Sequence, residues 1–269
     1  MSTEQFYDGL ADTYHALYPD WGSAVRAQGK ALHRLLSRWH ASPSDIADVA
    51  CGIGTQLLGL AERGHHVFGA DISARAVRRA RRECAAAGVP AALSVADMRK
   101  VPLTGSCVDA VICADNALPH LLADGDVLAA LTEMSRILRP GGTVIITTRD
   151  YDHVLAAPPA GTLPQVFRSS QGRIISFQLW TWRAGTDVYD LEHFQVHEGA
   201  DGAWATERRT AAYRAYTRAS LTGLASTAGL RNVTWHMPHE TGFFQPIMTA
   251  RTAAHEPPPT RQAGTRNSE

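Results

Sequence analysis

Apolar residues follow two alternating patterns along the first 150 residues. Short apolar runs predict buried strands over 46–50, 65–71, 91–97, 107–115 and 143–150. Amphipathic stretches between and before them predict helices over 22–40, 56–64, 73–88 and 124–138. Buried strands that alternate with helices are typical of a parallel sheet with right-handed crossovers. The pattern therefore predicts an α/β fold with a doubly wound, mostly parallel sheet.

The rhythm changes after residue 150. Apolar and polar residues then alternate with a period of two, interrupted by the turn signals AGTD and EGADGA. This predicts an inserted antiparallel β-meander of three strands. Helical spacing returns over 217–230, with Thr217 as the N-cap and Gly229 as the stop, and strands follow over 232–238 and 244–251.

These patterns divide the chain into five expected parts. The parallel core covers 44–150, and the inserted antiparallel, substrate-side subdomain covers 151–216. The end of the core sheet covers 217–252. The helical segment 1–43 is expected to form a lid. The polar, Pro-rich segment 253–269 is expected to be a disordered tail.

The amino-acid composition limits the classes of partner that we expect. Lys plus Arg and Asp plus Glu both number 26, which gives no electrostatic reason for a nucleic-acid or membrane partner. No apolar run approaches the ~18 residues of a membrane span, and the polar N-terminus does not look like a signal peptide. The four cysteines form no CxxC pair, so we expect reduced, mostly buried thiols in a cytoplasmic protein. The Ala- and Arg-rich composition hints at a high-GC bacterium. Monomer and homo-oligomer both stay open.

The stretch DVACGIGTQ, residues 48–56, predicts a tight turn between the first strand and its helix. Gly52 and Gly54 let the backbone pass close to a ligand, but the third glycine of a dinucleotide fingerprint is missing. Asp48 precedes the turn, where an acid repels a pyrophosphate and attracts an ammonium group. The turn therefore disfavours an NAD(P) oxidoreductase and favours a nucleoside that carries an amino-acid moiety.

Three further strand ends carry polar or contact residues. Asp71 ends the second strand, where a carboxylate can accept from both hydroxyls of a ribose. Asp97 and Met98 end the third strand, where a carboxylate can accept from an adenine amino group while Met covers the ring. Ala114 ends the fourth. Because these ends meet at one sheet edge, the sequence predicts an adenosine site there.

Four stretches together resemble a class I S-adenosylmethionine (SAM)-dependent methyltransferase with its Rossmann-like fold. They are DVACGIG, the acid of GADIS, the ADM after strand three and the LRPGG before strand five. The resemblance covers roughly residues 44–150. It implies SAM as cofactor and S-adenosylhomocysteine as product, with the methionyl end at the glycine turn. The cofactor contacts it implies are Tyr14, Arg26, Ala50, Gly52, Gly54, Asp71, Ile72, Asp97, Met98 and Ala114.

Three other stretches look like the glycine/sarcosine N-methyltransferases: EQFYDGLADTYHALYPDW, CADNALPHLL and TTRDYDHVLAAPP. This resemblance implies that Asn116 and Arg149 contact a substrate carboxylate and that N-terminal tyrosines close over the bound pair. His193 falls where the family uses a tyrosine. The implied catalytic residues are Tyr18, His120 and Arg149. The implied substrate-binding residues are Tyr7, Asn116, Arg149 and His193, with no metal.

The expected chemistry agrees with those residue types. Methyl transfer from a sulfonium is an in-line displacement with a good leaving group, so positioning the reacting atoms ~3–3.5 Å apart can supply most of the catalysis. Arg149 offers a planar fork for a carboxylate. His120 can help to deprotonate an amine, or it can be structural only.

The favoured function is methyl transfer to a small-molecule acceptor, with the amine of an amino-acid-like substrate preferred. O- or C-methylation of a specialised metabolite stays open, as does a non-catalytic SAM-binding protein. Asp115, Asp150 and Asp152 leave room for a metal-dependent O-methyltransferase. Another family tyrosine falls on Val166 or Phe167. The large side chains of the meander either pack in the core or line a larger acceptor pocket.

Overall fold

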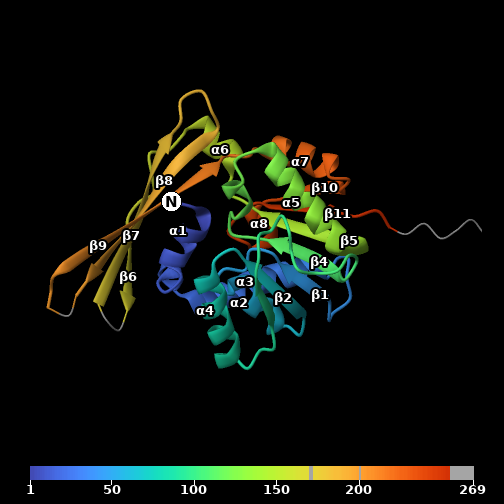
Figure 1. Ribbon diagram of the computed structural model, residues 1–269, viewed down its shortest axis with the longest axis horizontal. Helices are drawn as coiled ribbons and strands as arrows, with labels where there is room; N and C mark the ends of the chain where they lie inside the picture. The colour runs from blue at the N-terminus through green and yellow to red at the C-terminus, as the bar shows by residue number, and fades with distance from the viewer. Residues whose placement is uncertain (170–171, 200, 255–269) are drawn as a thin grey trace, which may run out of the picture.

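The computed structural model describes residues 1–169, 172–199 and 201–254. Within these residues the strands form a seven-stranded sheet, in the order β10-β11-β5-β4-β1-β2-β3, and a separate four-stranded sheet, in the order β6-β7-β8-β9 (Figure 1). The tail expected over 253–269 lies outside the described residues from position 255 onward.

The larger sheet has a parallel centre. Its five parallel strands are β1 (Asp45–Asp48), β2 (His66–Asp71), β3 (Ala92–Val95), β4 (Val108–Cys113) and β5 (Leu138–Thr147). β11 (Ile247–Arg251) pairs antiparallel with β5, and β10 (Arg231–His236) pairs antiparallel with β11. The strand order switches between β1 and β4, where doubly wound sheets bind their ligands. The predicted α/β doubly wound fold is confirmed.

Helices cover both faces of this sheet. α2 (Trp21–Leu36), α3 (Thr55–Ala61) and α4 (Ala74–Ala86) contribute to one apolar cluster, and α5 (Asp124–Ile137) and α7 (Arg218–Thr227) to the other. α2 and α3 touch backbone to backbone, because a Cβ on Gly29 would lie 2.3 Å from the Gly59 carbonyl oxygen. This contact fixes α3, and with it the glycine turn that precedes α3.

The antiparallel sheet has one strand more than predicted. Its strands are β6 (Gln165–Ser169), β7 (Gly172–Trp182), β8 (Val188–Glu198) and β9 (Trp204–Arg214). The expectation of three strands was wrong because β6 is short and carries the exposed Val166, so it shows little apolar alternation. β8 alternates between buried and part-exposed residues over most of its length, as a period of two requires.

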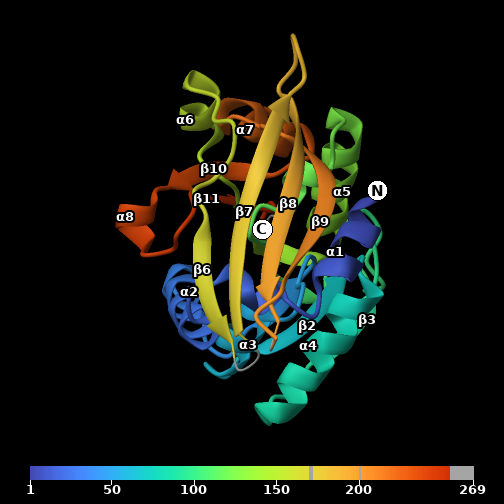
Figure 2. The ribbon, with the colours of Figure 1, turned by 90° about the vertical axis from the view of Figure 1, so that its left-hand side faces the viewer.

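α1 (Thr3–Leu10) lies between the antiparallel sheet and the core (Figures 1 and 2). Its Phe6 and Leu10 pack against the buried face of the sheet, which carries Trp180, Tyr189 and Tyr213. Short helices α6 (Tyr151–Ala156) and α8 (Pro238–Thr241) and the 3-10 turns η1 (Tyr14–Leu17) and η2 (Leu118–His120) complete the fold. α1 therefore closes the space between the two sheets.

The LRPGG segment differs from its expected role as a turn before the strand. β5 begins at Leu138 and includes it, with a register shift opposite Val108 and Ala110. Arg139 holds this end by donating to Asp109 at 2.6 Å and to Asp45 at 2.8 Å. Among the described residues, no helix is long and apolar enough to cross a membrane.

Candidate active site

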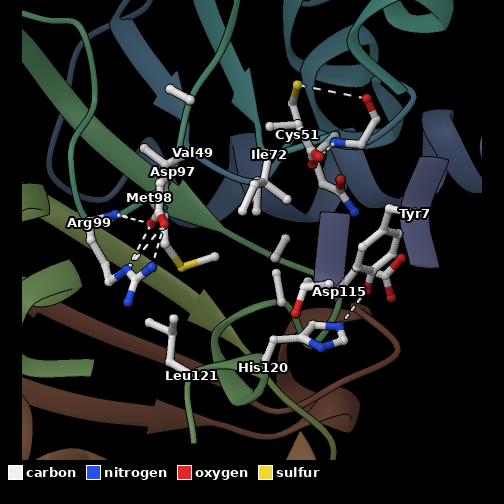
Figure 3. Close-up of a pocket in the computed structure, with 18 of the residues that line it drawn as sticks. Tyr7, Val49, Cys51, Ile72, Asp97, Met98, Arg99, Asp115, His120 and Leu121 are labelled. Atoms are coloured by element: carbon white, nitrogen blue, oxygen red, sulfur yellow. Dashed lines mark hydrogen bonds and ion pairs between the residues drawn. The ribbon is translucent and has the colours of Figure 1, made fainter. Parts of the chain in front are cut away.

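A cavity of about 340 Å³ lies at the carboxyl edge of the parallel strands (Figure 3). The ends of β1, β2, β3 and β4 line it, and α1 covers it. Of the residues predicted to form the site, the structure brings these together here: Tyr7, Tyr14, Ala50, Gly52, Asp71, Ile72, Asp97, Met98, Ala114 and His120.

The glycine turn is tied to Asp71. Gly52 has a left-handed φ of 51°, and its N–H donates to Asp71 Oδ2 at 2.8 Å. The N–H of Ser73 donates to Asp71 Oδ1 at 2.8 Å, and burial raises the pKa of Asp71. Two backbone amides therefore fix this carboxylate at the cavity wall, where its remaining lone pairs suit ribose hydroxyls. Gly54, with φ of 97°, shapes the start of α3 and does not line the cavity.

The opposite end of the cavity carries an ion-pair network. Arg99 donates to both oxygens of Asp97, with distances of 2.6 to 3.1 Å, and to Asp126 at 2.6 Å. The hydrogen bonds from Arg99 lower the pKa of Asp97. Figure 3 shows Asp97, Met98 and Arg99 on one side of the cavity and Tyr7, Asp115 and His120 on the other. The sequence analysis did not single out Arg99.

Two residues named from the sequence do not reach this cavity. Arg26 is exposed on α2 and donates to Ser23 Oγ at 2.9 Å. Arg99 is the sole arginine lining the cavity within the described chain. Asp48 is fully buried behind the turn, where its Oδ1 accepts from the Ala50 N–H at 3.3 Å and burial raises its pKa to about 7. The expected direct attraction of an ammonium group to Asp48 therefore has no geometric support.

A second cavity, of about 320 Å³, lies between the parallel core and the antiparallel sheet. Tyr18, Asn116, Arg149 and His193 line it, so the structure brings these predicted residues together as well. Tyr7, Tyr14 and Asp115 line both cavities. These three side chains form the boundary between a cofactor-sized space and an acceptor-sized one.

The guanidinium of Arg149 lies in this second cavity, which the carboxylate of Asp115 also lines. Its Nη1 donates to Tyr189 Oη at 2.6 Å and its Nη2 to Gln178 Oε1 at 3.1 Å. Its guanidinium carbon lies 4.6 Å from the centre of the Trp180 ring. In the part of the chain that the structure describes, it forms no ion pair with a carboxylate. An isolated guanidinium in an aromatic enclosure attracts an anionic ligand group.

Asn116 is hydrogen-bonded to the backbone of Arg149. The backbone of Asn116 is left-handed, with φ of 64°, and its Oδ1 accepts from the backbone N–H of Arg149 at 3.0 Å. That bond leaves the Nδ2 group buried with no partner among the described residues. Asn116 and Arg149 both line the second cavity.

His120 is held as a neutral ring. Its Nε2 lies 2.8 Å from Tyr7 Oη, and its ring centre lies 4.0 Å from that of Tyr213. Burial lowers the pKa of His120 to about 3. An imidazole so weakly basic is a poor acceptor for the proton of an ammonium group, and its geometry suits positioning of Tyr7. His193 lies 3.1 Å from Ser176 Oγ, and burial lowers its pKa to about 4.

Asp115 was not chosen as a site residue from the sequence. Its Oδ2 accepts from Tyr18 Oη at 2.5 Å and from Tyr14 Oη at 3.0 Å. The signal was present, because the acid directly follows the fourth strand. Asp150 and Asp152 instead face Arg218, at 2.8 and 3.4 Å. The described residues contain no group of three or more His, Cys, Asp or Glu side chains that could hold a metal ion.

The comparisons with known proteins agree with this geometry. A family model described as a methyltransferase domain matches residues 46–142. The chain is 32% identical over 154 residues to the glycine/sarcosine N-methyltransferase of Parasynechococcus marenigrum (strain WH8102), covering 56% of this chain and 53% of that protein. It is 28% identical over 242 residues to the glycine N-methyltransferase of Mus musculus, covering 84% and 82%.

A solved structure shares the fold. SAM-bound CalS10, described as an amino pentose methyltransferase from Micromonospora echinaspora, matches with a TM-score of 0.75 at 21% identity, covering 89% of this chain and 96% of that one. The chain therefore carries a SAM-dependent methyltransferase domain that resembles the class I enzymes and the glycine/sarcosine N-methyltransferases, and its cofactor is SAM.

Proposed function

We propose that this chain transfers the methyl group of SAM to the amine of a small molecule that also carries a carboxylate. The observation that carries the proposal is a guanidinium that forms no ion pair among the described residues, that of Arg149, together with the unpartnered Nδ2 group of Asn116, in the cavity beside the cofactor cavity. A guanidinium fork and a neutral amide donor together suit a carboxylate.

The two cavities divide the reaction between them. The first takes SAM, with Gly52 at the methionyl end, Asp71 at the ribose, and Asp97 with Met98 at the adenine. The second takes the acceptor, with its carboxylate on Arg149. The methyl group crosses at the boundary that Tyr7, Tyr14 and Asp115 form. Holding both partners across this boundary converts a bimolecular encounter into an oriented displacement.

The acceptor cavity has room for a larger molecule than glycine. A volume of about 320 Å³ is roughly ten times the ~30 Å³ that one water molecule takes in the liquid. Its outer wall includes the exposed Leu163 and Phe244 as well as Phe177. An amino acid with a large apolar side chain fits this arrangement, with the carboxylate inside and the side chain toward the mouth.

The test is a matched trio of acceptors offered to the purified chain with SAM. L-phenylalanine carries both the amine and the carboxylate, phenethylamine lacks the carboxylate, and L-phenyllactate replaces the amine by a hydroxyl. We expect S-adenosylhomocysteine and N-methylphenylalanine from the first and at least tenfold less product from each of the others. Equal turnover of phenethylamine would remove the carboxylate from the proposal, and methylation of phenyllactate on oxygen would favour an O-methyltransferase.

A further inference from the structure

We propose that the carboxylate of Asp115 binds the ammonium group of the acceptor and holds its nitrogen in place for methyl transfer. The inference rests on the proposed function and names the group that recognises the amine. From the sequence, Asp115 was considered only as one of three carboxylates that could hold a metal ion, not as a group that binds the acceptor.

The position of Asp115 follows from the two cavities. Asp115, Tyr7 and Tyr14 are the described residues that line both of them. An in-line transfer places the methyl group, and the atom that attacks it, at this boundary. Of the three side chains, only Asp115 carries a carboxylate. Figure 3 shows it on the same side of the cofactor cavity as Tyr7 and His120.

The hydrogen bonds of Asp115 leave one oxygen available. Both phenol groups, from Tyr14 and Tyr18, donate to Oδ2. Among the described residues, no donor reaches Oδ1, and no Lys, Arg or His forms an ion pair with this carboxylate. The two phenols orient the side chain and leave Oδ1 free to accept from a ligand. A partly buried carboxylate of this kind attracts a cation.

The backbone at Asp115 is held in an uncommon conformation. Asp115 has φ of 56° and is followed by Asn116 at 64°, two consecutive left-handed residues that are not glycine. The Asp115 N–H donates to Thr147 Oγ1 at 2.8 Å, and Thr147 donates to Gln245 Oε1 at 2.7 Å. Such strain persists where the surrounding structure enforces it, and it clusters at ligand sites. Here it places the anion beside the amide that faces Arg149.

The two charges suit the two ends of one zwitterion. Arg149 and Asn116 receive the carboxylate, and Asp115, one residue before Asn116, receives the ammonium group. The ammonium nitrogen loses one proton to water. Its freed lone pair forms the N–C bond to the methyl group, and the C–S bond breaks with its electrons on sulfur. The products are S-adenosylhomocysteine and an N-methylammonium group.

Neutral groups surround this step. Tyr7, Tyr14 and Tyr18 have pKa values raised by burial, and burial holds His120 uncharged. Arg149, the nearby cation, is committed to the carboxylate end. Among the described residues that line the boundary, Asp115 is therefore the group suited to bind the ammonium group.

The experiment compares L-phenylalanine with L-phenyllactate by calorimetry in the presence of S-adenosylhomocysteine, for the wild type and for Asp115→Asn. Asparagine keeps an oxygen for the two phenols and removes the charge. We expect the wild type to bind the amino acid at least about tenfold more tightly than the hydroxy acid. We expect Asp115→Asn to lose that preference while its affinity for S-adenosylhomocysteine stays within about threefold. Tyr18→Phe, which removes one phenol donor and keeps the charge, is the matched control and should retain the preference.

Each of the other outcomes contradicts either the role of Asp115 or the proposed function. An unchanged amine preference in Asp115→Asn overturns the role of Asp115 and leaves the proposed function standing. A comparable loss of S-adenosylhomocysteine binding assigns Asp115 to the cofactor instead. If the wild type itself shows no preference for the amine, the inference fails whether or not the variant folds. If the wild type binds neither ligand, the proposed function fails with it.

Discussion

Replacing Arg149 by methionine tests whether Arg149 binds the acceptor or mainly stabilises the fold. Both residues that accept hydrogen bonds from the Arg149 side chain also have a second hydrogen-bond partner. Tyr189 Oη also lies 3.0 Å from Tyr151 Oη, and Gln178 Oε1 also accepts from Trp180 Nε1 at 3.0 Å. Methionine can fill much of the vacated space with an apolar chain. The substitution therefore leaves neither Tyr189 nor Gln178 without a partner.

The magnitudes favour a stable variant that does not bind. Two hydrogen bonds to a charged group contribute roughly 1.5–3 kcal/mol each, and stacking on Trp180 adds about 1–2 kcal/mol. Desolvation of an ion costs several kcal/mol in the opposite direction. These terms nearly cancel, so we expect the free energy of unfolding of Arg149→Met to lie within about 1 kcal/mol of the wild type, or above it. Removal of one partner of a buried charge pair costs about 2–5 kcal/mol in binding, which is at least ~30-fold in affinity for a carboxylate acceptor.

The assay combines urea unfolding with calorimetric titration of L-phenylalanine in the presence of S-adenosylhomocysteine. Arg139→Met is the matched control, because Arg139 is ion-paired to Asp45 and Asp109 at the other end of the sheet. It should lose up to about 2 kcal/mol of stability and keep its acceptor affinity. A loss of more than 3 kcal/mol in Arg149→Met, with unchanged affinity of the folded fraction, would refute the reasoning and make Arg149 structural.

Three further predictions follow from the same structure. Asp71→Asn should weaken S-adenosylhomocysteine binding at least about tenfold by calorimetry, because a ribose hydroxyl loses its charged acceptor; unchanged affinity would place the ribose elsewhere. Burial lowers the pKa of His120 to about 3, below the ordinary ~6.5. Between these two pH values the unfolded chain binds more protons than the folded chain. The free energy of unfolding therefore falls as the pH drops below 6.5. His120→Gln should therefore lose about 2 kcal/mol less than the wild type between pH 7 and pH 4.5 in urea unfolding, and an equal loss would contradict the assigned pKa. Gly29→Ala should destabilise by roughly 2–4 kcal/mol because its Cβ meets the Gly59 carbonyl at 2.3 Å. Gly223→Ala in α7, where a Cβ meets nothing within 4 Å, should gain about 0.5–1 kcal/mol in thermal melts, and equal effects would argue against the α2–α3 contact.

The parallel core was predictable because its signals are local. Buried strands, helix caps such as Ser73 and Thr217, and glycines with positive φ each depend on a few neighbouring residues. The strand ends then meet at one edge for topological reasons, so the motif residues Gly52, Asp71 and Asp97 could be assigned to one site before any coordinates were known.

The acceptor side was less predictable because its residues come from distant segments. Gln178, Trp180 and Tyr189 surround Arg149 from β7 and β8, and no short motif marks them. β6 escaped detection because its alternation is weak. Arg26 was assigned through a resemblance, but its place on the solvent face of α2 keeps it from the cavity. Asp115 could have been chosen from its position after β4, but its two phenol partners lie about 100 residues earlier, on a segment whose packing the pattern does not give.

The most direct measurement of the central claim uses SAM labelled with ¹³C in its methyl group. The wild-type chain is incubated with the labelled SAM and L-phenylalanine, and the product is fragmented by mass spectrometry. We expect S-adenosylhomocysteine together with a product that carries the labelled methyl group on nitrogen, and at least about tenfold less of both from Arg149→Met under the same conditions. A labelled methyl group on oxygen or carbon, or equal turnover by Arg149→Met, would contradict it.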